Sequence, residues 1–153
     1  MRQSLATRWF EDFRIGERFV LPRRTVTAEA LRAFAEATGD LQPLRADPRD
    51  NDAIGFSCSL ARAFLAAVQS VASPGILPFL LEDSLIGLLD QSSRHLRAVT
   101  AGDMLSPVLQ VTELHPHNGG TGIVSLRSTL HNQAKALVME GSQRWLLRSQ
   151  PRG

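Results

Sequence analysis

The sequence predicts a single α+β domain in which one apolar helix is followed by several antiparallel strands. The chain has 153 residues with 43% hydrophobic content, which is enough for one compact core and too little for two ordinary domains. Apolar side chains recur at helical spacing in segment 57–72, with alanines at the remaining apolar positions. Strand-length segments separated by turn residues come after it. We therefore expect one domain, residues 1–153, whose sheet curves around a buried helix.

The N-terminal part predicts an edge strand and then a short helix. Segment 17–27 mixes apolar residues with arginines, and Pro22 cannot donate a hydrogen bond to a neighbouring strand. Thr27 occupies an N-cap position, and Gly39 ends the apolar periodicity that follows it. A helix between these two residues is the prediction. The next twelve residues contain two prolines and three aspartates, which is typical of a loop.

The C-terminal half predicts a meander of long strands. Segments 104–114, 121–132 and 136–147 have strand length, and Asn118-Gly119-Gly120 is a turn signal between the first two. Segment 84–99 predicts a further strand, although its early leucines are also compatible with a helical start. We interpret His115 and His117 as loop histidines, because Pro116 and the glycine turn adjoin them.

Composition bounds the classes of function. No apolar run approaches the roughly 18 residues of a membrane span, and the N-terminus lacks the apolar stretch of a secretory signal, so we expect a cytoplasmic protein without a membrane partner. Cys58 is the only cysteine, which excludes an internal disulfide. The net charge is +2 and the arginines are scattered, so nucleic acid is a weak hypothesis. The spacing of the four histidines does not indicate a metal site, and we expect no cofactor.

Several ordered motifs resemble the MaoC-like hot-dog family of (R)-specific enoyl-CoA hydratases and acyl dehydratases. These are the stretches 10–19, 25–27, 34–40, 42–48, 98–103 and 132–133. The resemblance implies a hot-dog fold, in which an antiparallel sheet wraps a central helix. It also implies an acyl thioester of CoA or an acyl carrier as ligand, hydratase or dehydratase chemistry, and a homodimer or higher oligomer.

The family's catalytic loop is only partly matched. It reads roughly Gly-Asp-x-Asn-Pro-x-His-x-Asp, and in relatives its first aspartate and its histidine hold a water molecule. Asp40 matches the aspartate, whereas Arg45 stands at the histidine position and Gln42 at the asparagine position. Asp40 is therefore the candidate general base, and its alternative role is a loop aspartate that caps the turn after Gly39.

Arg45 cannot take over the role of the histidine, because a guanidinium stays protonated and has no acceptor lone pair. Beside Asp40 it forms a structural ion pair in one interpretation. In the other, its planar fork binds a carboxylate or polarises a carbonyl of the substrate.

The start of the predicted central helix aligns with a second motif of the family. Ser57, Cys58 and Ser59 stand there. In relatives, a backbone amide at this point polarises the thioester carbonyl, which needs only an unsatisfied N–H and the helix dipole. One serine is expected to cap the helix. We interpret Cys58 as a small packed residue in preference to a nucleophile.

Two functions follow from these residues. The first is a hydro-lyase that acts on an acyl thioester at an altered active site, where Asp40 moves a proton. The second is a non-catalytic acyl-binding or partner subunit, which the exchange at Arg45 favours. Loss of a general acid or base typically costs about 10² to 10⁴ in rate, so ordinary enoyl-thioester hydration is expected to be feeble.

Overall fold

The computed structural model describes residues 7–38, 80–97 and 99–152. These contain the 3₁₀ turn η1 (Phe10–Asp12), the short strands β1 (Arg18–Val20) and β2 (Arg24–Thr25), and the helix α1 (Ala28–Thr38). The long strands are β3 (Leu85–His95), β4 (Met104–His117), β5 (Thr121–His131) and β6 (Leu137–Arg148). The predicted helix after Thr27 and the four predicted long strands are confirmed. The predicted central helix, 57–72, lies outside the described residues.

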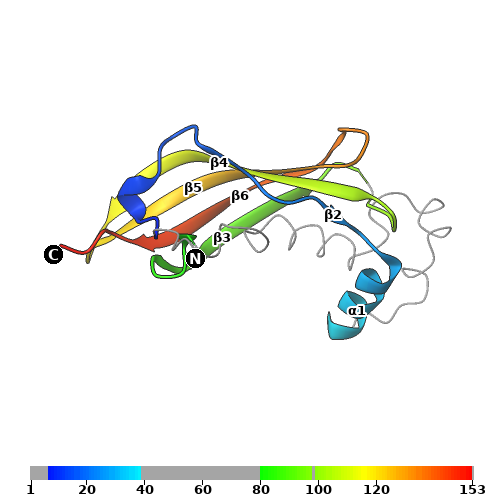
Figure 1. Cartoon of the computed structure of the whole chain (residues 1–153), viewed down its shortest axis with the longest axis horizontal. Coiled ribbons are helices and arrows are strands. Elements are labelled where there is room, and N and C mark those ends of the chain that lie inside the picture. Colours follow the sequence, from blue (N-terminus) through cyan, green and yellow to red (C-terminus); the bar gives the residue numbers. More distant parts are fainter. Residues whose placement is uncertain (1–6, 39–79, 98, 153) are drawn as a thin grey trace, which may run out of the picture.

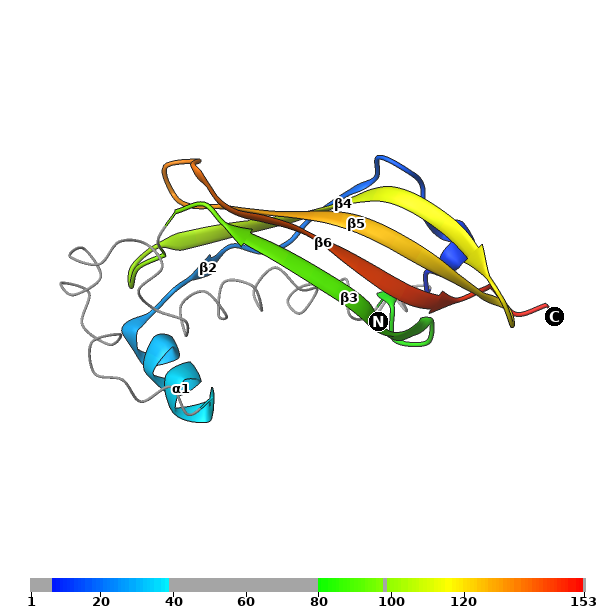
Figure 2. The same ribbon diagram turned by 180° about the vertical axis from the view of Figure 1, so that it is seen from behind.

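The strands form one antiparallel sheet in the order β1-β4-β5-β6-β3, and β2 pairs with the other end of β4. The sheet is long and curved, and α1 lies on its concave side at one end (Figure 1). β4, β5 and β6 are consecutive hairpin neighbours, whereas β3 crosses over to pair with β6. Seen from behind, β3 forms one edge of the sheet (Figure 2).

The predicted edge strand 17–27 is divided into β1 and β2. β1 pairs with β4 up to Val20↔Val108, and β2 resumes at Arg24↔Leu105. The backbone N–H of Leu21 donates to the carbonyl of Pro107. Since the nitrogen and the carbonyl of one residue point to the same side of a strand, the ring nitrogen of Pro107 also faces the gap between β1 and β2. A proline is tolerated at this position of β4 because its nitrogen, which carries no hydrogen, faces the gap between the two short strands, where no hydrogen bond of the ladder is lost.

The ends of the meander follow turn chemistry. Gly119 and Gly120 have φ of 75° and 69°, as the tight β4–β5 turn requires. His115 and His117 nevertheless belong to β4, so their interpretation as loop histidines is wrong: the strand continues through Pro116 to the turn itself. In the β5–β6 turn, Lys135 has a φ of 61° and is exposed.

Alternation along the strands builds the core on the concave side. Buried positions repeat every second residue, and cross-strand partners share a face. One apolar cluster lies toward η1 and comprises Phe13, Leu21, Leu81, Leu109, Val111, Val124, Leu126, Trp145 and Leu147. A second lies toward α1 and comprises Val26, Val99, Leu105, Leu130, Val138 and Met139.

The N-terminal segment is anchored beside the first cluster. The guanidinium of Arg8 lies 4.6 Å from the ring centroid of Phe13 and 5.3 Å from that of Phe19, and its Nη1 lies 2.6 Å from Oε2 of Glu17. The Phe10 ring covers the start of β5 at Gly122, where a Cβ would lie 2.3 Å from the ring. These contacts fix the approach of the chain to β1.

Candidate functional site

The candidate site residues from the sequence fall within 39–79 and so lie outside the described residues. They are Asp40, Gln42, Arg45, Ser57, Cys58 and Ser59. The structure describes the elements that lead into this segment and out of it. α1 ends at Thr38, two residues before Asp40, and β3 begins soon after the segment ends.

The beginning of α1 is held firmly at one end of the sheet. The hydroxyl of Thr27 accepts a hydrogen bond from the backbone N–H of Ala30 at 3.0 Å, which confirms the predicted N-cap. Val26 is 1% exposed, and its backbone N–H donates to the carbonyl of Asp103 at 2.8 Å. Its own carbonyl accepts from Gly102 at 2.7 Å. The element that leads into Asp40 therefore starts from a fixed point.

Two motif segments that carry the family resemblance meet at the same point. The side chain of Gln133 donates to Oδ1 of Asp103 at 3.0 Å, and its oxygen accepts from the backbone N–H of Met104 at 3.1 Å. The other oxygen of Asp103 accepts from the backbone N–H of Thr100 at 2.9 Å. Asn132 closes the neighbouring turn by accepting from the N–H groups of two later residues. These motif residues support the end of the sheet next to α1.

The concave face carries a polar band between its two apolar clusters. We define this polar band as Ser128 of β5, Gln143 of β6, and Gln91, Ser93 and His95 of β3. Gln91 pairs in register with Gln143, and Ser128 and Ser93 both lie opposite Gly141. Within the band, the side-chain amide of Gln91 donates to the Ser93 hydroxyl at 3.2 Å, and Gln143 accepts from the Trp145 indole at 3.0 Å. The concave face thus offers polar groups where a continuous apolar surface would be expected.

His95 is the titratable member of the polar band. It lies at the C-terminal end of β3, opposite the buried Met139, and is half-buried. Burial lowers its pKa below the ordinary value, which favours the neutral imidazole. His115 of β4 is exposed instead, and its Nε2 lies 2.8 Å from Oε2 of Glu113. His95 is therefore suited to donate or accept a hydrogen bond from a ligand.

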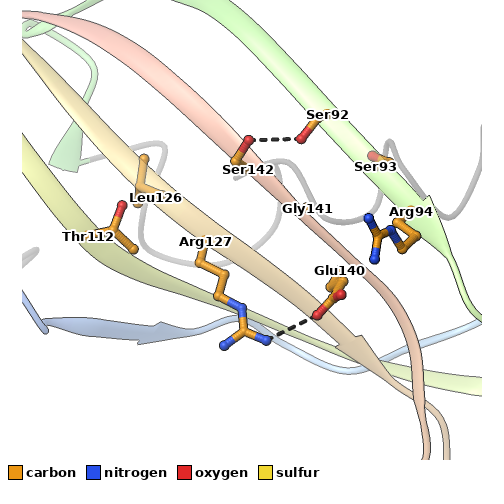
Figure 3. Close-up of a pocket in the computed structure, with 9 residues that line it drawn as sticks. All are labelled: Ser92, Ser93, Arg94, Thr112, Leu126, Arg127, Glu140, Gly141 and Ser142. Carbon is orange, nitrogen blue, oxygen red and sulfur yellow. Dashed lines mark hydrogen bonds and ion pairs between the residues drawn. The ribbon is translucent and has the colours of Figure 1, made fainter.

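The opposite, convex face holds an open hollow of about 530 Å³ (Figure 3). It is crossed by paired side chains: Arg127 Nη2 lies 3.1 Å from Oε2 of Glu140, and the hydroxyls of Ser92 and Ser142 are 2.8 Å apart. Such cross-strand pairs stabilise a solvent-facing sheet. We therefore place the candidate binding face on the concave side.

Among residues 7–38, 80–97 and 99–152 there is no group of three histidine, cysteine or acidic side chains placed to hold a metal ion. No helix in the described part of the chain is long and apolar enough to cross a membrane.

Comparison with known proteins gives the family. Residues 14–141 match the model of the FAS1-like dehydratase domain region, and this span includes α1 together with the segment that carries Asp40 and Arg45. The chain belongs to this dehydratase family. A UPF0336 protein from Streptomyces avermitilis is 30% identical over 135 residues, which cover 84% of this chain and 87% of the relative.

Solved structures show the fold of this family. A MaoC-like dehydratase from Rhodospirillum rubrum is 24% identical with a TM-score of 0.73, covering 94% of this chain and 99% of that one. Rv0216 from Mycobacterium tuberculosis, described as a double hot-dog fold, gives a TM-score of 0.73 at 23% identity, covering 96% of this chain and 46% of that one. The HadBC 3R-hydroxyacyl-ACP dehydratase complex of the same species gives 0.66 at 24% identity, covering 86% and 96%. The described sheet is therefore that of a hot-dog protein.

Sequence reasoning missed most of the polar band, although the strands contain a signal for it. Ser128 has the same parity as the buried Leu126 and Leu130, and Gln143 the same parity as Trp145. A polar residue at a buried parity of a long strand indicates either a satisfied core group or a ligand contact.

Proposed function

We propose that this chain is an acyl-thioester hydratase/dehydratase-type hydro-lyase with an altered active site. The observation that carries the proposal is the match to the dehydratase domain region over residues 14–141, which spans the loop that contains Asp40. The ligand is an acyl thioester of CoA or of an acyl carrier. The reaction adds water across the double bond of an enoyl thioester or removes it in the reverse direction.

In the direction of hydration, Asp40 takes a proton from water while the water oxygen bonds to the β-carbon. The electron pair of the double bond moves toward the thioester carbonyl, and a proton then reaches the α-carbon. Backbone N–H groups at the start of the segment with Ser57, Cys58 and Ser59 stabilise the negative charge on the carbonyl oxygen. Placed near Asp40, the guanidinium of Arg45 would favour the carboxylate form and so weaken it as a base.

The exchange of histidine for arginine at position 45 determines which substrates we expect the chain to turn over. Without a histidine to share the water with Asp40, hydration of a simple enoyl thioester is slow. Arg45 instead offers a planar fork for a carboxylate or carbonyl oxygen of the substrate. A substrate that carries such a group is the better candidate for turnover.

Turnover of a panel of enoyl- and 3-hydroxyacyl-CoA thioesters tests the proposal, with binding measured on the same samples by calorimetry. Asp40→Asn keeps the shape of the side chain and removes the proton acceptor, so turnover is expected to fall at least about a hundredfold while binding persists. Unchanged turnover in Asp40→Asn would place the chemistry elsewhere. Arg94→Gln, on the convex face, is the matched control.

A second function is favoured by the position of β3, which is the outermost strand of the sheet among the described residues. Leu85, Ile86, Leu88 and Leu89 are 42% to 47% exposed there, and the HadBC relative is a complex of two different chains. In this alternative, the chain binds the acyl group or supports a catalytic hot-dog partner without catalysing the reaction itself. Binding of acyl thioesters without turnover, followed by turnover when a catalytic dehydratase chain is added, would favour it.

A further inference from the structure

The convex face has a second, smaller hollow beside the one already described. It has a volume of about 260 Å³ and lies over β1, β4, β5 and the start of β6. Its polar lining residues share the outward-facing side of the sheet and are Arg18, Gln110, Arg127, Thr129 and His131. All five side chains can donate hydrogen bonds. No acidic side chain is among the described residues that line it, so this hollow offers donors and positive charge.

Strand pairing brings the two arginines of the smaller hollow into one row. Arg18 of β1 pairs with Gln110 of β4, and Gln110 pairs with Arg127 of β5. The two arginines therefore flank one glutamine, two inter-strand spacings apart, which is about 10 Å between their Cα atoms. Long side chains at this separation can both reach a ligand that lies above Gln110.

Short side chains leave the space next to this row open. Val108 of β4 and Thr129 of β5 pair directly in the neighbouring row, and both are half-buried. His131 follows two residues after Thr129 on the same face of β5 and bounds the far end. Valine and threonine extend less far from the sheet than arginine and histidine do. The hollow therefore has a low floor between cationic and imidazole side chains.

Positive charge is in excess across the two hollows of the convex face. Arg127 lines both of them, and its Nη2 lies 3.1 Å from Oε2 of Glu140 (Figure 3). That contact uses one of the five N–H groups of the guanidinium, so others remain available to a ligand. Arg94 lines the larger hollow and Arg18 the smaller one. Among the described lining residues, three guanidinium groups are thus balanced by one carboxylate.

We propose that the smaller convex hollow binds a phosphate group, with Arg18 and Arg127 as its charged contacts and Thr129 as a hydroxyl contact at its floor. The planar fork of a guanidinium matches two oxygens of a phosphate, and such charge-assisted hydrogen bonds are strong. The ligand is free phosphate or the phosphate end of a small ester. It lies on the face opposite the one proposed for the acyl thioester, so this inference does not rest on the proposed function.

Titration of the full-length protein with inorganic phosphate, followed by two-dimensional NMR, tests the proposal. Sodium chloride at matched ionic strength is the reference, because it screens charges equally without forking contacts. The backbone amide signals of Val108 and Thr129 are expected to shift to saturation with phosphate, with a Kd of about 1 mM or lower. Glycerol 3-phosphate, titrated in the same way, distinguishes the two sources: tighter binding than phosphate indicates an ester, and weaker binding indicates free phosphate.

Two substitutions remove the charged contacts. Arg18→Gln and Arg127→Gln are each expected to weaken phosphate binding about fivefold or more. Arg144→Gln is the matched control for Arg127→Gln. Arg144 is also exposed on the convex face and also paired with a carboxylate, that of Asp90, but it lines neither hollow. Its loss is expected to leave the Kd for phosphate unchanged.

Several outcomes would overturn the inference. It is wrong if no saturable shift occurs, or if chloride produces the same shifts at matched ionic strength. It is also wrong if Arg94→Gln weakens binding as much as Arg18→Gln does, because the anion then lies in the larger hollow. Saturating phosphate is expected to leave acyl-thioester binding unchanged, and competition that Arg18→Gln does not relieve would place the phosphate in the thioester site. Failure to bind any acyl thioester contradicts only the proposed function.

Discussion

Gln133 donates a hydrogen bond to Asp103 at 3.0 Å, and the two residues are 30 positions apart in the sequence. The bond joins the β5–β6 turn to the turn before β4. The carbonyl of Asp103 also accepts a hydrogen bond from the backbone N–H of Val26. The turn that contains Asp103 therefore also fixes the segment that leads into α1. Support for the start of α1 is therefore built from residues remote from it in sequence.

Gln133→Ala is expected to lower the free energy of unfolding by about 1 kcal/mol, because it leaves an oxygen of Asp103 and the N–H of Met104 without their partner. Urea denaturation measures the change. Gln150→Ala, at an exposed position near the C-terminus, is the control and is expected to stay within about 0.5 kcal/mol. Equal effects of the two substitutions would show that the bond adds nothing to stability.

Acid is expected to weaken the anchor at Arg8. The hydrogen bond and charge of Arg8 hold the pKa of Glu17 below its usual range. A lowered carboxyl pKa contributes stability that is present above the ordinary value and lost as pH falls through the folded-state pKa. Glu17→Gln should therefore be less stable than the wild type near neutral pH, and the difference should shrink on acidification. Denaturation at several pH values checks this, and a difference independent of pH would contradict it.

The edge position of β3, with its exposed apolar side chains, predicts self-association. Replacing Ile86 and Leu88 together with lysine is expected to abolish self-association, because both side chains are nearly half exposed on the outermost strand of the described sheet. Sedimentation velocity at micromolar concentration measures the change. Ile15→Lys, at 68% exposure and away from that edge, is the control. A wild type that is already monomeric would remove the basis for a homodimer.

Restoring the family pattern in the loop is expected to raise hydration. Arg45→His combined with Gln42→Asn allows a neutral imidazole to share a water with Asp40, so hydration of crotonyl-CoA should appear or increase. Loss of absorbance of the enoyl thioester measures the rate at fixed enzyme concentration, with folding verified by circular dichroism. Brisk hydration by the wild type would show that Arg45 is no handicap.

The sheet was predictable because its strands are long and because β5 and the first half of β4 alternate regularly between buried and less buried positions. Val124, Leu126 and Leu130 mark the buried parity of β5, and glycines mark the turn before it. The division of the first strand was not predictable, because it depends on where Pro107 of β4 meets the chain near Pro22. The predicted strand 104–114 is too short because a proline was expected to end it. Pro116 instead lies within β4 and pairs with Gly122 of β5.

The candidate site was predictable only as a set of residue types. The loop with Asp40 and Arg45 was identified from its order of residues, and those assignments remain predictions. The polar band was missed because neither Ser128 nor His95 belongs to a local motif. They share a face only after β3 has crossed over to pair with β6, which is a consequence of topology and not of spacing along the chain.

The left-handed residue in the β5–β6 turn has a practical use. Lys135 is the only lysine of the chain, and it is exposed at the tip of a hairpin. An amine-reactive dye or a surface coupling at high pH can therefore reach one side-chain position besides the N-terminus, and a lysine-specific protease has a single cleavage site. The molecule can be attached, labelled or cut at a defined point remote in the sequence from β3, so its assembly can be observed without an engineered tag.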